Sequence, residues 1–438
     1  MPAGAMIRRT AALLLLLLCS LAAAASTPKG DWLLLPDRVW TADGNAAHAG
    51  WAVLVHDGAI AAVGPRDAVH APADARRIEL PGATLTPGLV DLHSHLFLHP
   101  YNETSWNDQV LTEPQAYRTL EAAAHARATL LAGFTALRDL GTEGAGFADV
   151  SIKRAIEEGL IPGPRMFVAT RAIVATASYG PGPRGFRPDL ELPQGAQPVT
   201  GVDAAVAAVR EQAARGADWI KLYADYRVGD HGETMPTLSP TEIKAIVAAA
   251  HQIGRPVAAH AASDAGVRNA VEAGVDTIEH GYGASEATFR LMKQKGVAYE
   301  PTLTAVEAVS EYFQHYVPGQ SAPTPAMQKS ARAFRTALKL GVTIGNGSDV
   351  GVYAHGQNWR EPAAMVADGM TAPQALHAAT DVAARILRQQ QVFGRIAPAL
   401  RADLAAFAGD PSVHIDDLAH PVFVMKNGTV YRSPQTTP

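Results

Sequence analysis

The chain has 438 residues and a formal net charge of −5, and only 18% of its residues are charged. Because 47% of the chain is hydrophobic, a disordered and highly charged protein is excluded and a large buried core is expected. The mild acidity gives no sign of the clustered basic surface that nucleic-acid binding requires, so we expect no nucleic-acid partner.

The N-terminus has the pattern of an export signal. Arg8 and Arg9 precede an apolar run at residues 11–21, and small residues follow as far as Ala25. A membrane-spanning helix needs about 20 apolar residues, and this run is shorter. We therefore expect residues 1–25 to be a signal peptide and the mature protein to be periplasmic or secreted, with no stable membrane anchor.

The single cysteine, Cys19, lies within this segment. A lipid anchor on Cys19 is the alternative, although Leu18 stands where lipoprotein processing favours a small residue. Without Cys19 the mature protein has no thiolate, so any metal ion must be held by nitrogen and oxygen ligands. The 16 histidines are therefore the first residues to consider as ligands.

Short strands separated by turns are expected at both ends of the chain. Asp43-Gly44 and Asp57-Gly58 are hairpin signals. The strand-like segments are 32–35, 52–55 and 59–63 near the N-terminus, and 402–407, 422–425 and 429–431 near the C-terminus. We predict that residues 26–84 and 392–438 combine into a small composite β-sandwich domain.

Between these ends, strand-like segments alternate with alanine-rich helices. The expected strands are 86–92, 134–139, 165–169, 218–222, 256–259, 276–278, 296–299 and 342–344, and the expected helices include 202–215, 240–253 and 265–273. Glycines just beyond several helices fit left-handed C-caps. The pattern predicts an α/β fold in which residues 85–391 form a (β/α)8 TIM-like barrel. A doubly wound sheet is the alternative, but no glycine-rich phosphate loop follows the first strand.

Some of the loops after these strands are long and contain aromatic residues. The longest are 176–201 and 223–239, and a helix is expected to be inserted at 305–318. Such loops commonly shape the substrate pocket of a barrel enzyme. The aromatic residues in the loops hint at a bulky or apolar substrate; they are Phe97, Tyr101, Trp106, Tyr179, Phe186, Tyr353 and Trp359.

Five of the predicted strands end in residues that can bind a metal ion. These residues are His93 and His95, Lys221, His260, His280 and Asp349. Each has an ordinary structural explanation when taken alone, such as a hydrogen-bonded histidine or a helix-capping aspartate. Because the carboxyl ends of barrel strands meet at one mouth, the combination instead favours a single metal site. Imidazole with carboxylate suits zinc or a similar divalent ion.

Lys221 cannot bind a cation as an ammonium group. Buried beside two metal ions, it would have a lowered pKa and be a neutral amine. Such an amine can react with CO₂ to give a carbamate that bridges two ions. The expected cofactors are thus two divalent ions, with zinc favoured: His93, His95 and Asp349 hold one, His260 and His280 hold the other, and carboxylated Lys221 lies between them. A bridging hydroxide would be nucleophilic near neutral pH.

The sequence around these positions resembles the amidohydrolase superfamily. The motifs are Pro87-Gly-Leu-Val-Asp-Leu-His-Ser-His95, Trp219-Ile-Lys221-Leu-Tyr223, Ala258-Ala-His260-Ala261, Thr277-Ile-Glu-His280-Gly281 and Gly347-Ser-Asp349. From about Ala52 to Val430 the chain is similar to the prolidase-like branch related to imidazolonepropionases. That branch includes Xaa-Pro and Xaa-Arg dipeptidases and ochratoxin-hydrolysing amidohydrolases. Many relatives have threonine in place of Ser348, which is a conservative difference.

The resemblance implies catalytic and substrate-binding roles for several residues. The hydroxide would attack an amide carbonyl, and Asp349 would take its proton and return it to the leaving amine. Tyr223 would hydrogen-bond the substrate near the developing oxyanion, and His355 would contact the substrate. Ordinary structural roles for Tyr223 and His355 are the alternative. Arg138 and Asp139, at the end of the second strand, are interpreted as a structural ion pair.

The sequence therefore predicts an exported, binuclear metal-dependent amidohydrolase that cleaves an amide or peptide bond to an amino acid. Its substrate would be a small-molecule amide or dipeptide, with N-acylated phenylalanine, as in ochratoxin, as one class. Hydrolysis of cyclic amides or amidines, as in imidazolonepropionase-like or hydantoinase-like enzymes, is the alternative. Lys221 argues against the mononuclear members of that group. A binding protein without activity is disfavoured because all six ligands are present, and a homo-oligomer is compatible with the sequence.

Overall fold

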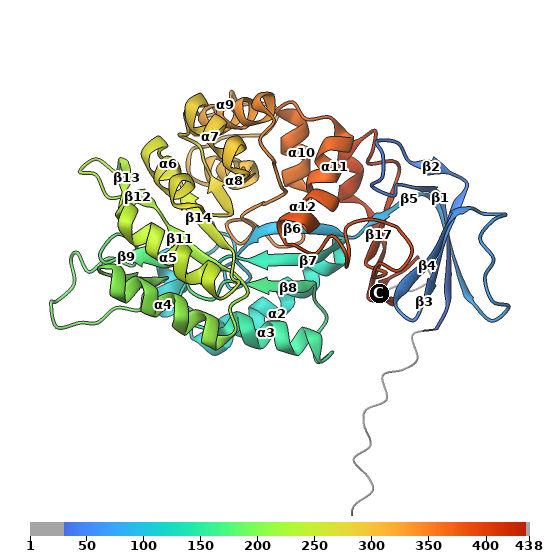
Figure 1. Cartoon of the computed structure of the whole chain (residues 1–438), viewed down its shortest axis with the longest axis horizontal. Helices are drawn as coiled ribbons and strands as arrows, with labels where there is room; N and C mark the ends of the chain where they lie inside the picture. The colour runs from blue at the N-terminus through green and yellow to red at the C-terminus, as the bar shows by residue number, and fades with distance from the viewer. Residues whose placement is uncertain (1–29, 435–438) are drawn as a thin grey trace, which may run out of the picture.

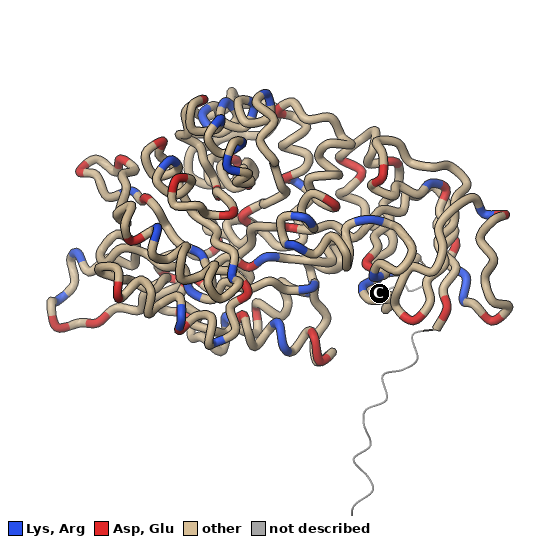
Figure 2. The backbone as a smooth tube through the Cα atoms, viewed as in Figure 1, with Lys and Arg blue, Asp and Glu red and all other residues tan. Residues whose placement is uncertain are grey.

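The computed structural model describes residues 30–434, so the signal peptide predicted at 1–25 lies outside the described residues. The described chain is a mixed α/β structure, with a strand-rich part at one end and helices packed on parallel strands in the rest (Figure 1). Within 30–434, no helix combines the length and apolar character needed to cross a bilayer. Basic and acidic residues are interspersed along the chain (Figure 2).

Both ends of the described chain contribute strands to one eight-stranded sheet, whose order is β19-β18-β17-β5-β1-β3-β4 with β2 paired to β1. The strands are β1 (Trp32–Val39), β2 (His48–Ala49), β3 (Trp51–His56), β4 (Ala59–Pro65), β5 (Arg76–Pro87), β17 (Leu404–Ala408), β18 (Pro421–Lys426) and β19 (Thr429–Arg432). The two ends meet where β17 runs antiparallel to β5 (Figure 1). One apolar cluster, which includes Leu34 and Phe423, holds them together.

The remaining strands form two parallel sheets and one separate hairpin. The sheet orders are β6-β7-β8 and β10-β9-β11-β14-β15-β16. Their bounds are β6 (Leu89–Ser94), β7 (Phe134–Asp139), β8 (Arg165–Val168), β9 (Ile173–Ala175), β10 (Gln197–Val199), β11 (Ile220–Tyr223), β14 (Val257–Ala261), β15 (Thr277–His280) and β16 (Ala298–Glu300). The hairpin β12 (Asp225–Arg227) and β13 (Thr234–Pro236) directly follows β11.

Backbone hydrogen bonds connect the two parallel sheets on both sides. Trp219 N donates to Val168 O at 3.2 Å, which joins the end of β8 to the start of β11. On the other side, Leu92 N of β6 donates to Asn346 O at 2.7 Å, and Tyr299 N of β16 donates to Thr343 O at 2.9 Å. The carboxyl ends of these strands therefore lie at one edge of the molecule.

Two predicted strands differ from the observed ones. The segment predicted at 342–344 forms only an isolated bridge, Tyr299↔Ile344, rather than a strand. The first parallel strand starts at Leu89 and not near Thr86, because Thr86 belongs to β5 and pairs with Ala405 of the composite sheet. In both cases long-range pairing overrides the local apolar pattern.

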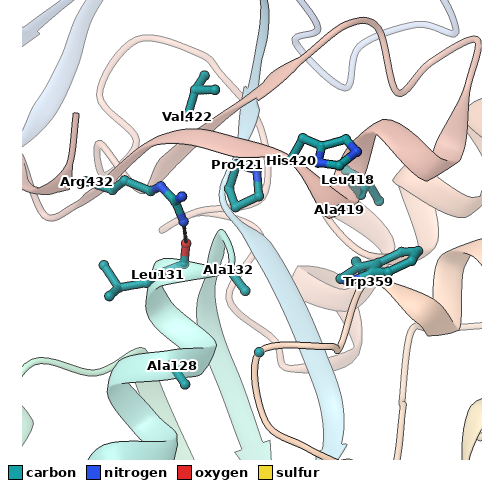
Figure 3. A pocket seen from close by; sticks show the side chains of 11 residues that line it. Ala128, Leu131, Ala132, Trp359, Leu418, Ala419, His420, Pro421, Val422 and Arg432 are labelled. Carbon is teal, nitrogen blue, oxygen red and sulfur yellow. Dashed lines mark hydrogen bonds between the residues drawn. The ribbon is translucent and has the colours of Figure 1, made fainter. Parts of the chain in front are cut away.

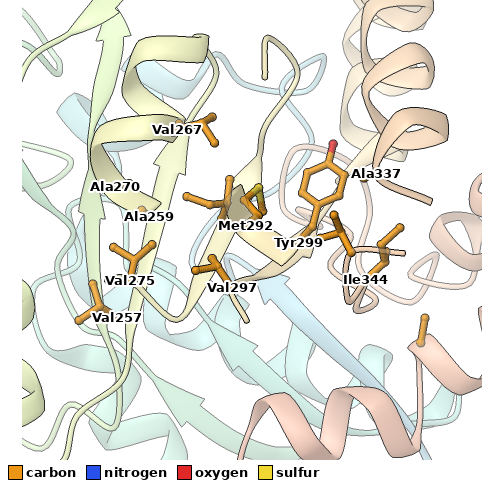
Figure 4. Packing of buried hydrophobic residues seen from close by; sticks show 14 of the residues in the cluster. Val257, Ala259, Val267, Ala270, Val275, Met292, Val297, Tyr299, Ala337 and Ile344 are labelled. Carbon is orange, nitrogen blue, oxygen red and sulfur yellow. The ribbon is translucent and has the colours of Figure 1, made fainter. Parts of the chain in front are cut away.

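Helices cover the outside of the parallel strands. They are α1 (Trp106–Thr112), α2 (Gln115–Leu131), α3 (Ala148–Glu157), α4 (Val202–Arg215), α5 (Pro240–Gln252), α6 (Asp264–Ala273), α7 (Glu286–Lys295), α8 (Leu303–Phe313), α9 (Pro325–Leu340), α10 (Arg360–Ala367), α11 (Ala372–Ala378), α12 (Asp381–Ile386) and the 3₁₀ helix η1 (Ile415–Ala419). Figure 4 shows how side chains of β14, α6 and α7, such as Val257, Val267 and Met292, interdigitate. Burying a side chain of this kind stabilises the fold by about 1.5–3 kcal/mol.

Candidate metal centre

The six predicted ligands lie together at the carboxyl ends of the parallel strands. His93 lies on β6, Lys221 on β11, His260 on β14 and His280 at the end of β15. His95 directly follows β6, and Asp349 lies in the segment between α9 and α10. The ring centroid of His93 is 5.3 Å from that of His95 and 5.0 Å from that of His280. The ring centroids of His260 and His280 are 4.5 Å apart.

Three of these residues already have the geometry of a metal-binding set. The candidate ligand atoms of His93, His95 and Asp349 all lie within 4.8 Å of one another. Asp349 Oδ1 is 3.4 Å from His93 Nε2 and 3.3 Å from His95 Nε2. Two imidazole nitrogens and a carboxylate oxygen at this spacing fit a divalent first-row ion.

Hydrogen bonds on the far side of the rings fix how the histidines face the centre. His93 Nδ1 donates to Glu279 Oε2 at 2.9 Å, and His95 Nδ1 donates to Gly141 O at 2.9 Å. Because these oxygens can only accept, Nδ1 of each ring carries a proton, and Nε2 is the nitrogen that faces Asp349 and the centre.

Burial favours the neutral, metal-binding form of most of these rings. It lowers the pKa of His93 to about 4, and it lowers the pKa values of His260 and His280 well below their usual range. His95 is different: burial lowers its pKa, but the hydrogen bond to Asp349 and the charge of Glu143 raise it to about 9. Negative charge thus accumulates on the side of the centre that contains His95, where a cation would neutralise it.

Lys221 is fully buried, and its Nζ has no hydrogen-bond partner among residues 30–434. Burial lowers its pKa to about 8. A buried ammonium group without hydrogen bonds is strongly disfavoured, so this position suits an amine that reacts in its neutral form. The donor set around Lys221 therefore fits two divalent ions joined by a modified lysine.

Glu279, to which the sequence analysis gave no role, holds the candidate ligand His93 in position. It is fully buried, and its carboxylate accepts hydrogen bonds from His93 and from Arg138 Nη2, the latter at 3.0 Å. The ion pair of Arg138 is thus made with Glu279 and not with Asp139, because neighbouring residues of a strand point to opposite faces. Asp139 instead accepts from Leu96 N. In β15 the polar residues Thr277 and Glu279 alternate with the apolar Ile278, and this alternation was the sequence signal that Glu279 faces the interior with Thr277.

Asp91 holds the segment that carries Asp349. Its carboxylate accepts from the backbone N–H groups of His93 and Ser348, at 3.1 and 3.0 Å, and from the Ser348 hydroxyl. Asp349 itself has a positive φ of 60°, a conformation that costs free energy in a residue other than glycine. The hydroxyl of Ser348, through its hydrogen bond to Asp91, therefore helps to hold the neighbouring Asp349 in position.

A cavity of about 430 Å³ opens onto the centre. His95, His260, His280 and Asp349 line it together with a group of tyrosines, Tyr101, Tyr179, Tyr223, Tyr226 and Tyr282. Tyr223 stacks on His260 with a centroid distance of 4.3 Å, and its hydroxyl is 3.5 Å from that of Tyr179. The predicted substrate-binding residue Tyr223 thus lies in the cavity wall beside a candidate ligand.

The other loop aromatics are divided between the cavity and the scaffold. Tyr101 and Tyr179 line the cavity, and Trp106 packs against Tyr179. Phe97 and Tyr353 are buried in the scaffold, and Phe186 is exposed. Trp359 lines a second cavity of about 460 Å³ between the end of α2 and η1, which contains none of the predicted ligands (Figure 3).

His355 is not among the residues that line the cavity at the metal centre. Its Nε2 lies 3.0 Å from Leu98 O, and its ring stacks on His125 with a centroid distance of 4.2 Å. Leu98 links the two regions, because it lines the cavity and its carbonyl oxygen contacts His355. A direct substrate contact of His355 stays a prediction.

The chain is similar to several known proteins. Residues 84–432 match the amidohydrolase family. The crystal structure of a Xaa-Pro dipeptidase with methionine bound in its active site superimposes with a TM-score of 0.81 at 29% identity, covering 92% of this chain and 100% of that one. An uncharacterised protein of Mycobacterium tuberculosis is 31% identical over 360 residues, which are 80% of this chain and 86% of that protein.

Ochratoxinase of Aspergillus niger is 29% identical over 414 residues, covering 88% of this chain and 84% of the enzyme. Its crystal structure superimposes with a TM-score of 0.78, covering 93% of this chain and 97% of that one. These likenesses extend over the composite sheet as well as the parallel strands. The chain therefore belongs to the amidohydrolase family, within its prolidase-like branch, and is a hydrolase of amide or peptide C–N bonds.

Proposed function

We propose that the protein is a binuclear metal-dependent amidohydrolase that releases an amino acid from a small-molecule amide or dipeptide. The observation that carries this proposal is the position of Lys221. Its buried Nζ lacks a hydrogen-bond partner among the described residues and lies within the group of histidines that converge at the strand ends. A mononuclear centre has no need of such a lysine.

In this proposal His93, His95 and Asp349 would hold one ion, and His260 and His280 would hold the other. Lys221, once carboxylated by CO₂, would supply ligand oxygens to both ions. Nitrogen and oxygen donors of this kind favour zinc. When bound, the ions supply electrophilic polarisation of the amide carbonyl and lower the pKa of water.

Asp349 is the proposed proton carrier. Burial raises its pKa, but the charge of His93 and the hydrogen bond from His95 outweigh burial and hold the pKa below its usual value. The carboxylate is therefore ionised at neutral pH and able to accept a proton from water and pass it to the leaving amine. Its place in the cavity wall gives it access to both.

Tyr223 is the proposed donor to the substrate oxygen on which negative charge develops. Burial raises its pKa well above the usual value, so the hydroxyl keeps its proton at neutral pH. The stacking contact with His260 fixes the ring, Tyr223 lines the cavity, and its hydroxyl lies 3.5 Å from that of Tyr179. A preorganised donor of this kind stabilises an oxyanion.

We also propose that the parallel strands close into one (β/α)8 barrel within residues 85–391, and that residues 26–84 and 392–438 form the accompanying β-sandwich domain. The hydrogen bonds that join β8 to β11 and β6 to the 342–350 segment support closure. Of the proposed domain, 26–29 and 435–438 lie outside the described residues. The proposed location is periplasmic or extracellular, on the basis of the N-terminal sequence pattern.

The tyrosine-lined cavity favours a substrate with an aromatic or otherwise bulky group. N-acylated phenylalanine, the linkage in ochratoxin, and dipeptides are the two proposed classes. The names of the relatives, an ochratoxinase and a Xaa-Pro dipeptidase, support amides of amino acids over cyclic amides.

Metal analysis of the purified protein combined with a substrate panel tests the proposal. The panel contains N-acyl amino acids, dipeptides and cyclic imides. We expect two divalent ions per chain and hydrolysis of the linear amides. Full activity with fewer than two ions per chain would contradict the binuclear centre, and exclusive activity on cyclic imides would support the alternative reaction instead.

A further inference from the structure

A second group of possible metal ligands lies outside the centre described above. It consists of His99, Glu113 and Glu121, whose candidate ligand atoms all lie within 4.8 Å of one another. His99 lies in the segment between β6 and α1, Glu113 caps the carboxyl end of α1, and Glu121 lies on α2. None of the three lines the cavity at the metal centre. Three segments of the chain thus bring one imidazole and two carboxylates to a separate place.

The imidazole of His99 is held in a fixed orientation. Its side chain is only 10% exposed, and its backbone N–H and C=O both hydrogen-bond the side chain of Gln109, at 3.1 and 2.8 Å. The two ring nitrogens face different carboxylates: Nδ1 lies 3.3 Å from Glu103 Oε2, and Nε2 lies 2.9 Å from Glu113 Oε1. When one nitrogen of a histidine binds a metal ion, the other commonly donates to a carboxylate. Glu103 is therefore placed to orient the ring, with Nε2 directed toward Glu113.

The carboxylates of Glu113 and Glu121 each have one oxygen without a hydrogen bond. Glu113 Oε2 and Glu121 Oε2 are shielded from solvent, and neither has a partner among residues 30–434. The whole Glu113 side chain is only 14% exposed. Glu121 accepts a hydrogen bond from the Tyr117 hydroxyl, which leaves its Oε2 unpaired. A buried carboxylate oxygen without a partner costs free energy, and a cation bound by both carboxylates would remove this cost.

The basic residues of the neighbourhood do not neutralise these two carboxylates. In the described part of the chain, neither Glu113 nor Glu121 forms an ion pair with a lysine or an arginine. The charges of both act on Arg118, but its guanidinium donates to the backbone oxygens of Phe97 and Glu143 instead. Buried carboxylates are normally paired with a cation or bound to a metal ion. A divalent ion would supply the missing positive charge.

We infer that His99, Glu113 and Glu121 form a further binding site for a divalent first-row ion such as zinc, separate from the proposed binuclear centre. Imidazole and carboxylate are suitable ligands for such an ion. Around a tetrahedral zinc ion with bonds of about 2.0–2.2 Å, neighbouring ligand atoms are about 3.4 Å apart. The present separations, 2.9 Å between His99 and Glu113 and no more than 4.8 Å within the group, need only small side-chain movements to reach this value.

The ion of this site is structural. His99 lies in the chain between Leu98 and Tyr101, which both line the cavity at the metal centre. An ion shared with Glu113 and Glu121 ties this part of the cavity wall to α1 and α2 from behind. Because the site has only three side-chain ligands, it fills when zinc is supplied in excess of the two ions proposed for the centre.

Equilibrium dialysis of the full-length protein against increasing free zinc tests the inference. At saturation we expect the wild type to bind one zinc ion per chain more than Glu113→Gln or Glu121→Gln, because each substitution removes a ligand. Glu103→Ala keeps all three ligands and should weaken the site by about 10- to 100-fold. Glu157→Gln is the matched control, since Glu157 is an exposed glutamate at the end of α3, and it should bind as much zinc as the wild type.

The place of the ion is tested by diffraction at the zinc absorption edge from crystals soaked in zinc. We expect an anomalous peak within bonding distance of His99, Glu113 and Glu121. Glu121 is half-buried on the outside of a helix, so Glu121→Gln decides the zinc count if Glu113→Gln does not fold.

Two results would overturn the inference. Equal zinc counts for the wild type and Glu121→Gln, without an anomalous peak at the three side chains, would leave His99 as a protonated counter-ion of the carboxylates. An equal loss of zinc in Glu157→Gln and Glu121→Gln would mean adventitious binding to carboxylates in general. A centre that binds fewer than two ions contradicts the proposed function but leaves the difference between wild type and Glu121→Gln unchanged, so the two failures are distinguishable.

Discussion

The substitution Glu279→Gln removes one buried charge and keeps the shape of the side chain. The carboxylate of Glu279 accepts from His93 Nδ1 on Oε2 at 2.9 Å, and from Arg138 Nη2 and Thr277 Oγ1 on Oε1 at 3.0 and 2.5 Å. Burial raises the pKa of Glu279, but the charge of Arg138 and the hydrogen bond from His93 outweigh it and hold the pKa at about 2. The group is therefore ionised at neutral pH, and all its partners are donors.

A glutamine has only one carbonyl oxygen for these donors. If that oxygen faces Arg138, the amide N–H groups face His93, whose Nδ1 must then become an acceptor. The proton of His93 moves to Nε2, the nitrogen that faces Asp349, and we expect metal affinity to fall about 10- to 100-fold. In either orientation the glutamine is neutral, so the buried guanidinium of Arg138 loses its counter-ion, which costs about 3–5 kcal/mol of stability.

Two measurements on the same variant follow these effects. Competition with a chelator gives the zinc affinity, and urea denaturation of the metal-free protein gives the free energy of unfolding. Glu286→Gln is the control, because Glu286 pairs with Arg290 on the exposed face of α7 and its loss should change neither quantity. A Glu279→Gln variant with wild-type zinc affinity and wild-type stability would refute the role assigned to this carboxylate.

Three further substitutions test other parts of the site. Lys221→Ala should lose most activity and regain part of it when acetate or propionate is added, because a small carboxylate can replace the carbamate; a fully active variant in a steady-state assay would contradict the shared-ligand role. Tyr223→Phe should lower kcat by roughly 10²- to 10³-fold with an unchanged metal content, as for the loss of one oxyanion donor. An unchanged kcat would leave Tyr223 with a structural role only. Glu361→Gln should gain stability relative to the wild type between about pH 4.5 and 8, as measured by urea denaturation. Burial raises the pKa of Glu361 to about 8, so over this range the unfolded chain ionises while the folded chain stays protonated, and the wild type alone loses stability. A difference that does not change with pH would contradict this account.

The sequence alone determined the local elements that depend on neighbouring residues. The helix predicted at 202–215 is α4, because Ala205, Ala208, Val209 and Gln212 form one buried face and Gly216 ends the helix with a φ of 112°. The same local reasoning placed the candidate ligands at strand ends, since apolar runs mark the strands and the polar residues that follow them mark their carboxyl ends.

The tertiary structure decided the features that depend on residues far apart in the chain. Thr86 joined the composite sheet because Ala405 was there to pair with it, and the salt bridge of Arg138 went to Glu279 because both point to the interior of the parallel strands. Side-chain identity and local periodicity are properties of the sequence, whereas burial, charge neighbours and hydrogen-bond partners arise only when distant segments pack together.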